Sequence, residues 1–244
     1  MGWDITYHPV SSAEIQSLYF RGVEDPDHYL RLAEQFGVDD FYAEQLRSRF
    51  AEARGLEASV PFNKGHAFYL AIVSGFLRKH HYIRGGAFSF LADNPVFSSY
   101  ISDLRPLVPE RFQDLQFDNR LTENYCGGVF ISFESLKRLR SDYESDAEVR
   151  QGLDEVFSHG RLELFWRSVD AAVAEELGLL EAAEVVEPFP LDLNRTRSLT
   201  NLFNCHHDGA LLYAEAAAQQ LAAAVAASEP PPPKKRSMWS RLFG

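Results

Sequence analysis

The chain has 244 residues, a length that allows one large domain or two small ones. Hydrophobic residues make up 45% and charged residues 24%, which is ordinary for a globular protein and excludes wholesale disorder. The formal net charge is −11, from 35 acidic residues against 24 Lys and Arg. Because phosphate binding requires a positive surface, this charge argues against a general nucleic-acid-binding protein.

Composition changes sharply near the C-terminal end of the chain. Residues 230–233 are four consecutive prolines, which favour an extended and semi-rigid spacer. Residues 228–244 carry four basic side chains and one acidic one, a formal charge of +3, which leaves −14 for residues 1–227. We therefore predict a single α-rich α+β domain over 1–227. A Pro-rich spacer and a basic amphipathic tail follow over 228–244.

Capping residues and apolar periodicity predict helices in the first third of the chain. Ser11 and Glu14 have the spacing of a capping box, which predicts a helix over 13–20. Three further N-caps each precede a helical pattern, with predicted limits of Asp25 to Gly37, Asp39 to Gly55 and Asn63 to about His80. The third pattern is apolar on nearly every face, which is typical of a buried helix. The basic run over 78–81 would lie at its C-terminus, where positive charge offsets the helix dipole.

The rest of the chain continues the helical pattern with few strands. Predicted helices cover 133–143, 146–157, 161–177 and 209 to about 227. Strand candidates are short and cover 3–7, 87–91, 129–131 and 184–186. The pattern predicts an α+β fold that is predominantly helical, with a small sheet of short strands.

The chain shows no strong membrane or export signal. The first ten residues carry Asp4 and His8 and no long apolar run, so no signal peptide is expected. Residues 210–227 are long enough to span a membrane, but one Glu and two Gln interrupt them, which favours a soluble helix. We therefore expect a cytoplasmic protein with no integral membrane segment. Its two cysteines, Cys126 and Cys205, are expected to be reduced and buried, with a disulfide as the alternative.

The most concentrated polar segment is Asn204-Cys205-His206-His207-Asp208. Thiolate, imidazole and carboxylate groups are all zinc ligands, but consecutive side chains point apart and zinc motifs space their ligands by two or more residues. A helix start explains the segment better, with Asp208 or Asn204 as the cap and Cys205 packed inward. A binding loop is the third interpretation. We predict no metal and no cofactor.

A cysteine nucleophile is the second candidate chemistry. Cys126 precedes Gly127-Gly128, whose backbone N–H groups could face an oxyanion, and His66 or His206 could act as its base. A small buried residue before a strand is the more common role of such a cysteine, and we predict no catalytic residue. The enzyme alternative is a hydrolase or other small-molecule enzyme, with or without zinc. Its site would be drawn from Cys126, His66, Cys205, His206, His207 and Asp208.

Aromatic residues are abundant, with 19 Phe, 10 Tyr and 3 Trp. Most are expected in the core. Phe88, Phe90, Phe97 and Tyr100 lie in a turn-rich region, where some could line a cleft. Aromatic residues at a surface favour contact with a partner.

The tail combines apolar and basic side chains. Trp239, Leu242 and Phe243 are spaced i, i+3 and i+4, so they would share one face of a helix. Positive charge around that face comes from Lys234, Lys235, Arg236 and Arg241. We predict that these seven residues form a short docking element for a partner protein. An anionic membrane surface, the acidic body of the same chain and a disordered solubilising tail are the alternatives.

Three segments carry a family resemblance: residues 1–7 with 10–15, residues 63–70, and residues 131–136. These segments resemble parts of the small bacterial family typified by the YfbM protein. The first is similar to its opening strand and first capped helix, and the second to its buried helix, which is entered through a Lys and a His. The third is similar to its second strand-to-helix transition. These fragments cover under a fifth of the chain, and residues 205–208 have no counterpart. The resemblance implies an α+β fold and no known activity.

Together these patterns favour a non-enzymatic, cytoplasmic protein-binding domain. The acidic body favours a basic protein partner through electrostatic complementarity. A bacterial immunity protein that neutralises a cationic toxin, or an accessory chaperone for a secreted effector, fits this charge, size and lack of catalytic motifs. No nucleic-acid partner is expected, and the sequence leaves the oligomeric state open.

Overall fold

The computed structural model describes residues 3–228 and has an α+β fold that is predominantly helical. A five-stranded mixed sheet runs through its centre, in the order β3-β4-β1-β2-β7. Every neighbouring pair is antiparallel except β2 and β7, which run parallel. The five strands are β1 (Asp4–Val10), β2 (His80–Arg84), β3 (Gly127–Ile131), β4 (Gly178–Ala183) and β7 (Cys205–His206). A separate hairpin pairs β5 (Val186–Glu187) with β6 (Arg197–Ser198).

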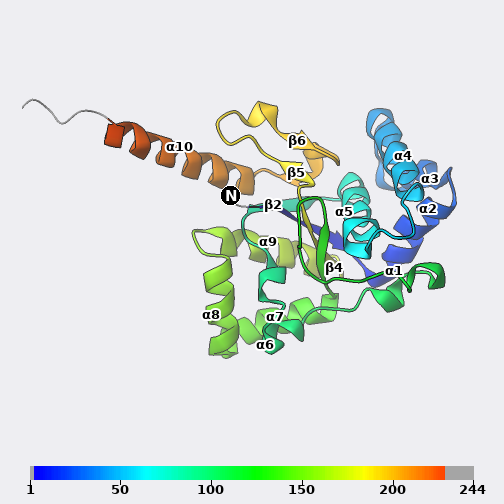
Figure 1. Ribbon diagram of the computed structural model, residues 1–244, viewed down its shortest axis with the longest axis horizontal. Helices are drawn as coiled ribbons and strands as arrows, with labels where there is room; N and C mark the ends of the chain where they lie inside the picture. The colour runs from blue at the N-terminus through cyan, green and yellow to red at the C-terminus, as the bar shows by residue number, and fades with distance from the viewer. Residues whose placement is uncertain (1–2, 229–244) are drawn as a thin grey trace, which may run out of the picture.

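Helices cover both faces of the sheet, so its central strands are buried on both sides (Figure 1). The layer over one face consists of the π-helix η1 (Ile15–Phe20), α2 (Arg21–Glu24), α3 (His28–Phe36), α4 (Asp40–Arg54) and α5 (His66–Leu77). The short helix α1 (Ser12–Glu14) leads into η1 and has no buried residue. The other face packs on η3 (Phe88–Leu91), α6 (Pro95–Ser98), α7 (Phe133–Ser145), α8 (Ala147–Val156) and α9 (Arg161–Ala174). The last helix, α10 (Asp208–Ser228), projects away from the sheet in Figure 1.

The helix α5 is the centre of the first layer, as its apolar sequence predicts. All of its residues except Tyr69 are buried. It lies so close to the sheet that a Cβ added at Gly127 would sit 2.5 Å from the Cβ of Ala67. Glycine is therefore required at the start of β3, because any side chain there would push the helix off the sheet.

Local capping signals are largely confirmed. Ser11 and Glu14 form a complete capping box, and the helical turns that follow continue through η1 and α2 to Glu24. Asp39 caps α4 by accepting the backbone N–H of Tyr42 at 2.9 Å. The N-cap predicted at Asp25 is wrong, because α3 starts two residues later, after Asp27.

Two predictions around α5 are also wrong. Asn63 belongs to a short 3-10 turn, η2 (Phe62–Lys64), and the helix begins only at His66. The helix ends at Leu77, and His80 starts the strand β2. Arg78 is the C-cap of α5 and Lys79 follows it, so the first half of the basic run lies at the helix C-terminus as predicted. His80 and His81 belong to β2 instead, because pairing with β1 competes with the helix there.

Among the strands, the sequence prediction is correct for β1 and β3. Residues 87–91 form the 3-10 turn η3 instead of a strand. The predicted strand at 184–186 is displaced, because the chain pairs as β4 over Gly178–Ala183 and as β5 at Val186–Glu187. The sequence of β4, GLLEAA, consists largely of helix-forming residues, and only burial between two helical layers makes it a strand.

Candidate functional site

Four of the eight histidines gather at one edge of the sheet. His8 lies on β1, His80 and His81 lie on β2, and His206 lies on β7. The rings of His8 and His80 stack with centroids 4.8 Å apart, and those of His81 and His206 stack at 4.1 Å. The parallel pairing of β2 with β7 brings the second pair together, since it places His81 opposite His206. We call these four residues the histidine cluster.

Burial favours the uncharged form of His8, His80 and His81. Burial lowers the pKa of His80 to about 4 and that of His81 to about 3, and the positive charge of a neighbouring histidine acts in the same direction. The Nε2 atom of His8 lies 2.8 Å from Thr6 Oγ1. Within residues 3–228, no group of three His, Cys, Asp or Glu side chains has an arrangement that could hold a metal ion. The stacked rings therefore pack this edge of the sheet, with His8, His80 and His81 buried and His206 at the exposed end.

The helix α10 starts at the end of the segment 204–208, but neither predicted cap, Asn204 nor Asp208, precedes its first residue as the N-cap. Asn204 caps the opposite end of another helix, because its Nδ2 donates to the carbonyls of Gly75 and Phe76 in the last turn of α5. Cys205 packs against the apolar core, as expected. Asp208 is the first residue of α10 and forms an ion pair with Arg167 of α9.

Cys126 is not placed as a nucleophile. Its side chain is fully buried and its thiol donates to the carbonyl of Glu123 at 2.7 Å. Burial raises the pKa of this thiol, which disfavours the reactive thiolate. None of the hydrogen bonds of Cys126 among the described residues involves a histidine. His66, its candidate base, bonds to Tyr19 in the other core layer.

Both thiols are free, and we expect them to react slowly in the native protein. Burial raises the pKa of Cys205 to about 12 and also raises that of Cys126, so few thiolates form at pH 8. A thiol reagent such as DTNB should label both cysteines quickly in denaturant and slowly without it, and a reductant should leave the Tm unchanged. A Tm that falls by several degrees on reduction would indicate a disulfide instead.

A buried carboxylate that the sequence analysis did not single out lies in the middle of β4. Glu181 is fully buried, and its Oε2 accepts from the hydroxyl of Tyr7 at 2.9 Å and from the backbone N–H of Phe88. Ser89 N–H lies 3.4 Å from both carboxylate oxygens. These bonds tie the start of η3 to the sheet. Glu181 lines none of the five main hollows, and its bonds to Tyr7 and Phe88 support a structural role.

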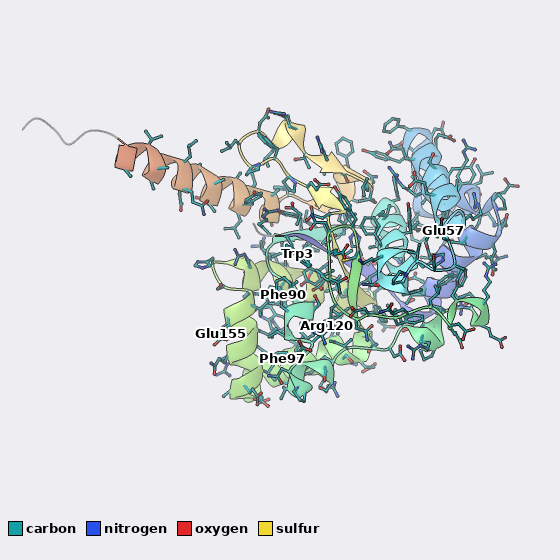
Figure 2. The ribbon with its side chains drawn as sticks, in the orientation of Figure 1. Trp3, Glu57, Phe90, Phe97, Arg120 and Glu155 are labelled. Atoms are coloured by element: carbon teal, nitrogen blue, oxygen red, sulfur yellow. The ribbon has the colours of Figure 1, made fainter. Side chains whose placement is uncertain are left out.

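The turn-rich region around η3 contributes mainly to the core. Phe88, Phe97 and Tyr100 are buried. Phe90 is half exposed and packs edge-on against Trp3 with ring centroids 5.8 Å apart, as their neighbouring positions in Figure 2 show. The four aromatic side chains therefore form no open cleft.

The most exposed aromatic side chains of the described chain lie together on the α4 side of the molecule. Phe203 is 80% exposed and Phe41 is 68% exposed. The ring of Tyr42 lies between them, with its centroid 5.1 Å from that of Phe41 and 6.3 Å from that of Phe203. Leu202 adds a fourth partly exposed apolar side chain beside Phe203. We call Phe41, Tyr42, Leu202 and Phe203 the aromatic patch.

The position of the aromatic patch follows from two local structures. Asp39 caps α4, which places Phe41 in the first turn of that helix. A 3-10 turn over Leu202–Asn204 carries Phe203, and Lys79 Nζ donates to the carbonyl of Phe203 at 2.7 Å. Because Asn204 holds this turn on α5, the two halves of the patch are fixed relative to each other.

The helix α10 contacts the body only through its first turns. Arg84 lies over the ring of Tyr213 at 4.6 Å, and the window 208–227 as a whole is not buried. By length and composition alone, this helix could cross a membrane. One helix that meets these criteria is weak evidence for a membrane span. The predicted docking residues Trp239, Leu242, Phe243, Lys234, Lys235, Arg236 and Arg241 lie outside the described residues.

In comparisons with known proteins, no protein-family model, no curated protein and no solved structure matches this chain.

Proposed function

We propose that this chain is a non-enzymatic protein-binding domain whose aromatic patch receives a basic partner protein. The observation that carries the proposal is the exposure of Phe41 and Phe203, 68% and 80%, on a rigidly held surface. Burying two Phe side chains and one Tyr side chain in an interface gives the kind of aromatic anchor that dominates binding energy. Scattered exposed apolar residues need no explanation, but a contiguous aromatic group favours partner contact.

Charge around the aromatic patch selects the partner. Residues 34–44 hold four acidic side chains and no Lys or Arg. Asp39 and Asp40 are both exposed and directly precede Phe41. The formal charge of −14 over residues 1–227 would steer a cationic protein toward this surface. A basic segment with one or two apolar side chains fits the patch best.

The biological class that we propose is the one the sequence favours: a cytoplasmic bacterial immunity protein for a cationic toxin, or an accessory chaperone for a secreted effector. Both roles need a stable, acidic surface with a strong anchor and need no catalytic groups. The resemblance to the YfbM-like family adds no activity to this proposal.

The test is a binding measurement with a defined partner. Proteins captured from the native host are identified by mass spectrometry, and the most abundant one is purified and titrated against the chain. Phe203→Ser should weaken its binding about 30-fold, since an anchor of this kind contributes about 2 kcal/mol. The matched control is Leu191→Ser, which removes a side chain that is 58% exposed on the β5–β6 hairpin and should leave the affinity unchanged.

The charge contribution is measured separately. Asp40→Asn should slow association and reduce its dependence on salt, because steering is screened over about 10 Å at 0.1 M salt. Asp39 is left intact because it caps α4. A captured partner that is acidic, or one that binds Phe203→Ser and the unmodified chain equally, would contradict the proposal.

A further inference from the structure

The end of α4 and the start of α5 enclose a hollow that the proposed function does not use. Its volume is about 470 Å³, within the range of small-molecule sites. It is lined by Val23, Glu24, Ala53, Arg54, Leu56, His66, Arg111 and Phe112. Asp39 and Arg54 lie at opposite ends of α4, roughly 20 Å apart at 1.5 Å per residue, so this hollow is separate from the aromatic patch.

His66 is the innermost polar side chain of the hollow. It is the first residue of α5 and only 6% exposed. Aromatic rings surround it: the ring centroids of Phe112, Phe20 and Tyr19 lie 4.5, 5.7 and 5.8 Å from its own. The hydroxyl of Tyr19 lies 2.8 Å from His66 Nδ1, on the side away from the open space.

The hydrogen-bond pattern fixes the tautomer of His66. Tyr19 is fully buried, and burial raises the pKa of its hydroxyl, so the group stays protonated. Its only hydrogen-bond partner among residues 3–228 is His66 Nδ1, and a buried hydroxyl donates to the acceptor it has. Burial and the charge of Arg111 lower the pKa of His66 to about 4, so the ring is neutral at pH 7. The single ring proton therefore sits on Nε2.

That Nε2–H group has no hydrogen-bond partner within the described chain. Although the His66 side chain is almost completely buried, its Nε2 atom is not among the fully enclosed polar atoms, so it is reached from the hollow that His66 lines. A ligand that fills the hollow displaces water from this donor and has to accept its hydrogen bond in place of the water.

The other polar groups of the hollow are also donors. Arg54 is anchored by Nη1, which donates to the carbonyl of Gly22 at 2.9 Å. Arg111 lies over the ring of Phe112 at 4.5 Å and pairs with Glu24 at 3.2 Å. Two guanidinium groups therefore face one carboxylate, which leaves an excess of positive charge. Val23, Ala53 and Leu56 provide apolar wall between them.

We propose that this hollow binds a small organic anion, a carboxylate or phosphate ester with an apolar part, which accepts hydrogen bonds from His66, Arg54 and Arg111. A cation would be repelled by the two guanidinium groups. A purely apolar ligand would leave the Nε2–H donor unpaired. Arginine suits this role because its fork of donors matches both carboxylate and phosphate.

The experiment follows the ring nitrogens of His66 by ¹⁵N NMR of the full chain at pH 7. Sodium benzoate and phenyl phosphate are the two probes, titrated separately at constant ionic strength, and they distinguish a carboxylate from a phosphate ligand. The spectrum of the free protein should show the Nε2–H tautomer of His66. At least one probe should shift the His66 signals to saturation, whereas benzylamine, a cation of similar size, should not.

Variants assign the binding to the hollow. Arg111→Gln should weaken binding about tenfold or more, since a hydrogen bond to a charged group is lost. His66→Phe keeps the ring volume, removes the donor and should weaken binding by a similar factor. Arg47→Gln is the matched control, because Arg47 lies on the same helix and pairs with Glu44 at the surface, and it should bind like the unmodified chain. The proposal is overturned if neither anion shifts His66 saturably, if the proton is on Nδ1, or if Arg47→Gln and Arg111→Gln have equal effects.

Discussion

Acidification from pH 7 to pH 4 should remove the stability that the histidine cluster contributes, because its buried rings are held in their neutral form. Burial lowers the pKa of His80 to about 4 and that of His81 to about 3, and holds that of His8 well below its usual value. The unfolded chain titrates near pH 6.5, so it binds protons that the native state excludes. The contribution of these histidines is therefore fully present above about pH 6.5 and is lost as the pH falls toward 3 to 4.

The size of the effect is large relative to the stability of a typical domain. At about 1.4 kcal/mol per pKa unit, the loss is about 3 kcal/mol for His80 by pH 4, and for His81 it is about 3 kcal/mol by pH 4 and about 5 kcal/mol by pH 3. The sum is an upper bound because the rings interact, yet typical domains have only about 5–15 kcal/mol of stability. Glu181 and Glu184 act in the opposite direction, because burial raises the pKa of both carboxyls. The net loss is therefore steepest below about pH 4.5, where both carboxyls are protonated in the folded and unfolded states.

The variant His80→Phe tests this directly, since it keeps the ring stack on His8 and removes one titrating group. Urea unfolding at pH 7 and pH 4 should show that the variant loses about 3 kcal/mol less between the two pH values than the unmodified chain. His207→Gln is the control, because that side chain is exposed and lies outside the histidine cluster. If the free energy of unfolding falls equally for His80→Phe and the unmodified chain, the pKa of His80 is not lowered in the folded protein.

Helix boundaries that depend on a local signal could be predicted from the sequence. The caps at Ser11 and Asp39 are correct because each involves a side chain and a backbone group three residues away. The strand β4 could not be predicted in this way, because its residues prefer a helix and become a strand only between two neighbouring strands. The same holds for β2, whose basic residues resemble a helix terminus until β1 and β7 pair with it.

In the candidate site too, the sequence shows the residues but not the contacts between residues far apart in the chain. The doublets His80-His81 and His206-His207 are visible in the sequence, but their stacking depends on strands about 125 residues apart in the chain, a separation no local pattern encodes. From the sequence, the chemistry suggested for His66 is that of a base for Cys126. Its actual partner is Tyr19, 47 residues away, and its bond to Tyr19 determines which ring nitrogen faces the hollow.

The exposure of the aromatic patch has no sequence signal at all. Phe41 occupies a position in a helical pattern that equally suits a core residue, and the same is true of Phe203 in its turn. Only the packed structure separates them from buried neighbours such as Phe50 and Phe76. For this reason the sequence predicts a basic partner from net charge, but it does not locate the surface that we propose for it.

Replacing Glu181 by leucine should destabilise the protein by about 3 kcal/mol, the second large effect expected of a single side chain. The variant removes the acceptor of the Phe88 and Ser89 N–H groups, and each unpaired buried donor costs about 1–3 kcal/mol. For a chain of this length the Tm should fall by roughly 6–12 °C. Glu155→Leu is the control, because Glu155 is an exposed residue of α8 (Figure 2), and its change should stay within about 0.5 kcal/mol.

The pH dependence distinguishes a buried acid from a merely well-packed side chain. Burial raises the pKa of Glu181 to about 7, above its value of about 4.5 in the unfolded chain. A group shifted in this direction stabilises the protein fully below about pH 4.5 and loses that contribution as the pH rises through 7. The unmodified chain should therefore lose about 3 kcal/mol from this group between pH 5 and pH 9. Glu181→Gln, which keeps an acceptor and cannot ionise, should not show that loss. Parallel stability curves for the two proteins over this range would contradict the assignment of Glu181 as a carboxyl that is neutral in the fold at acidic pH.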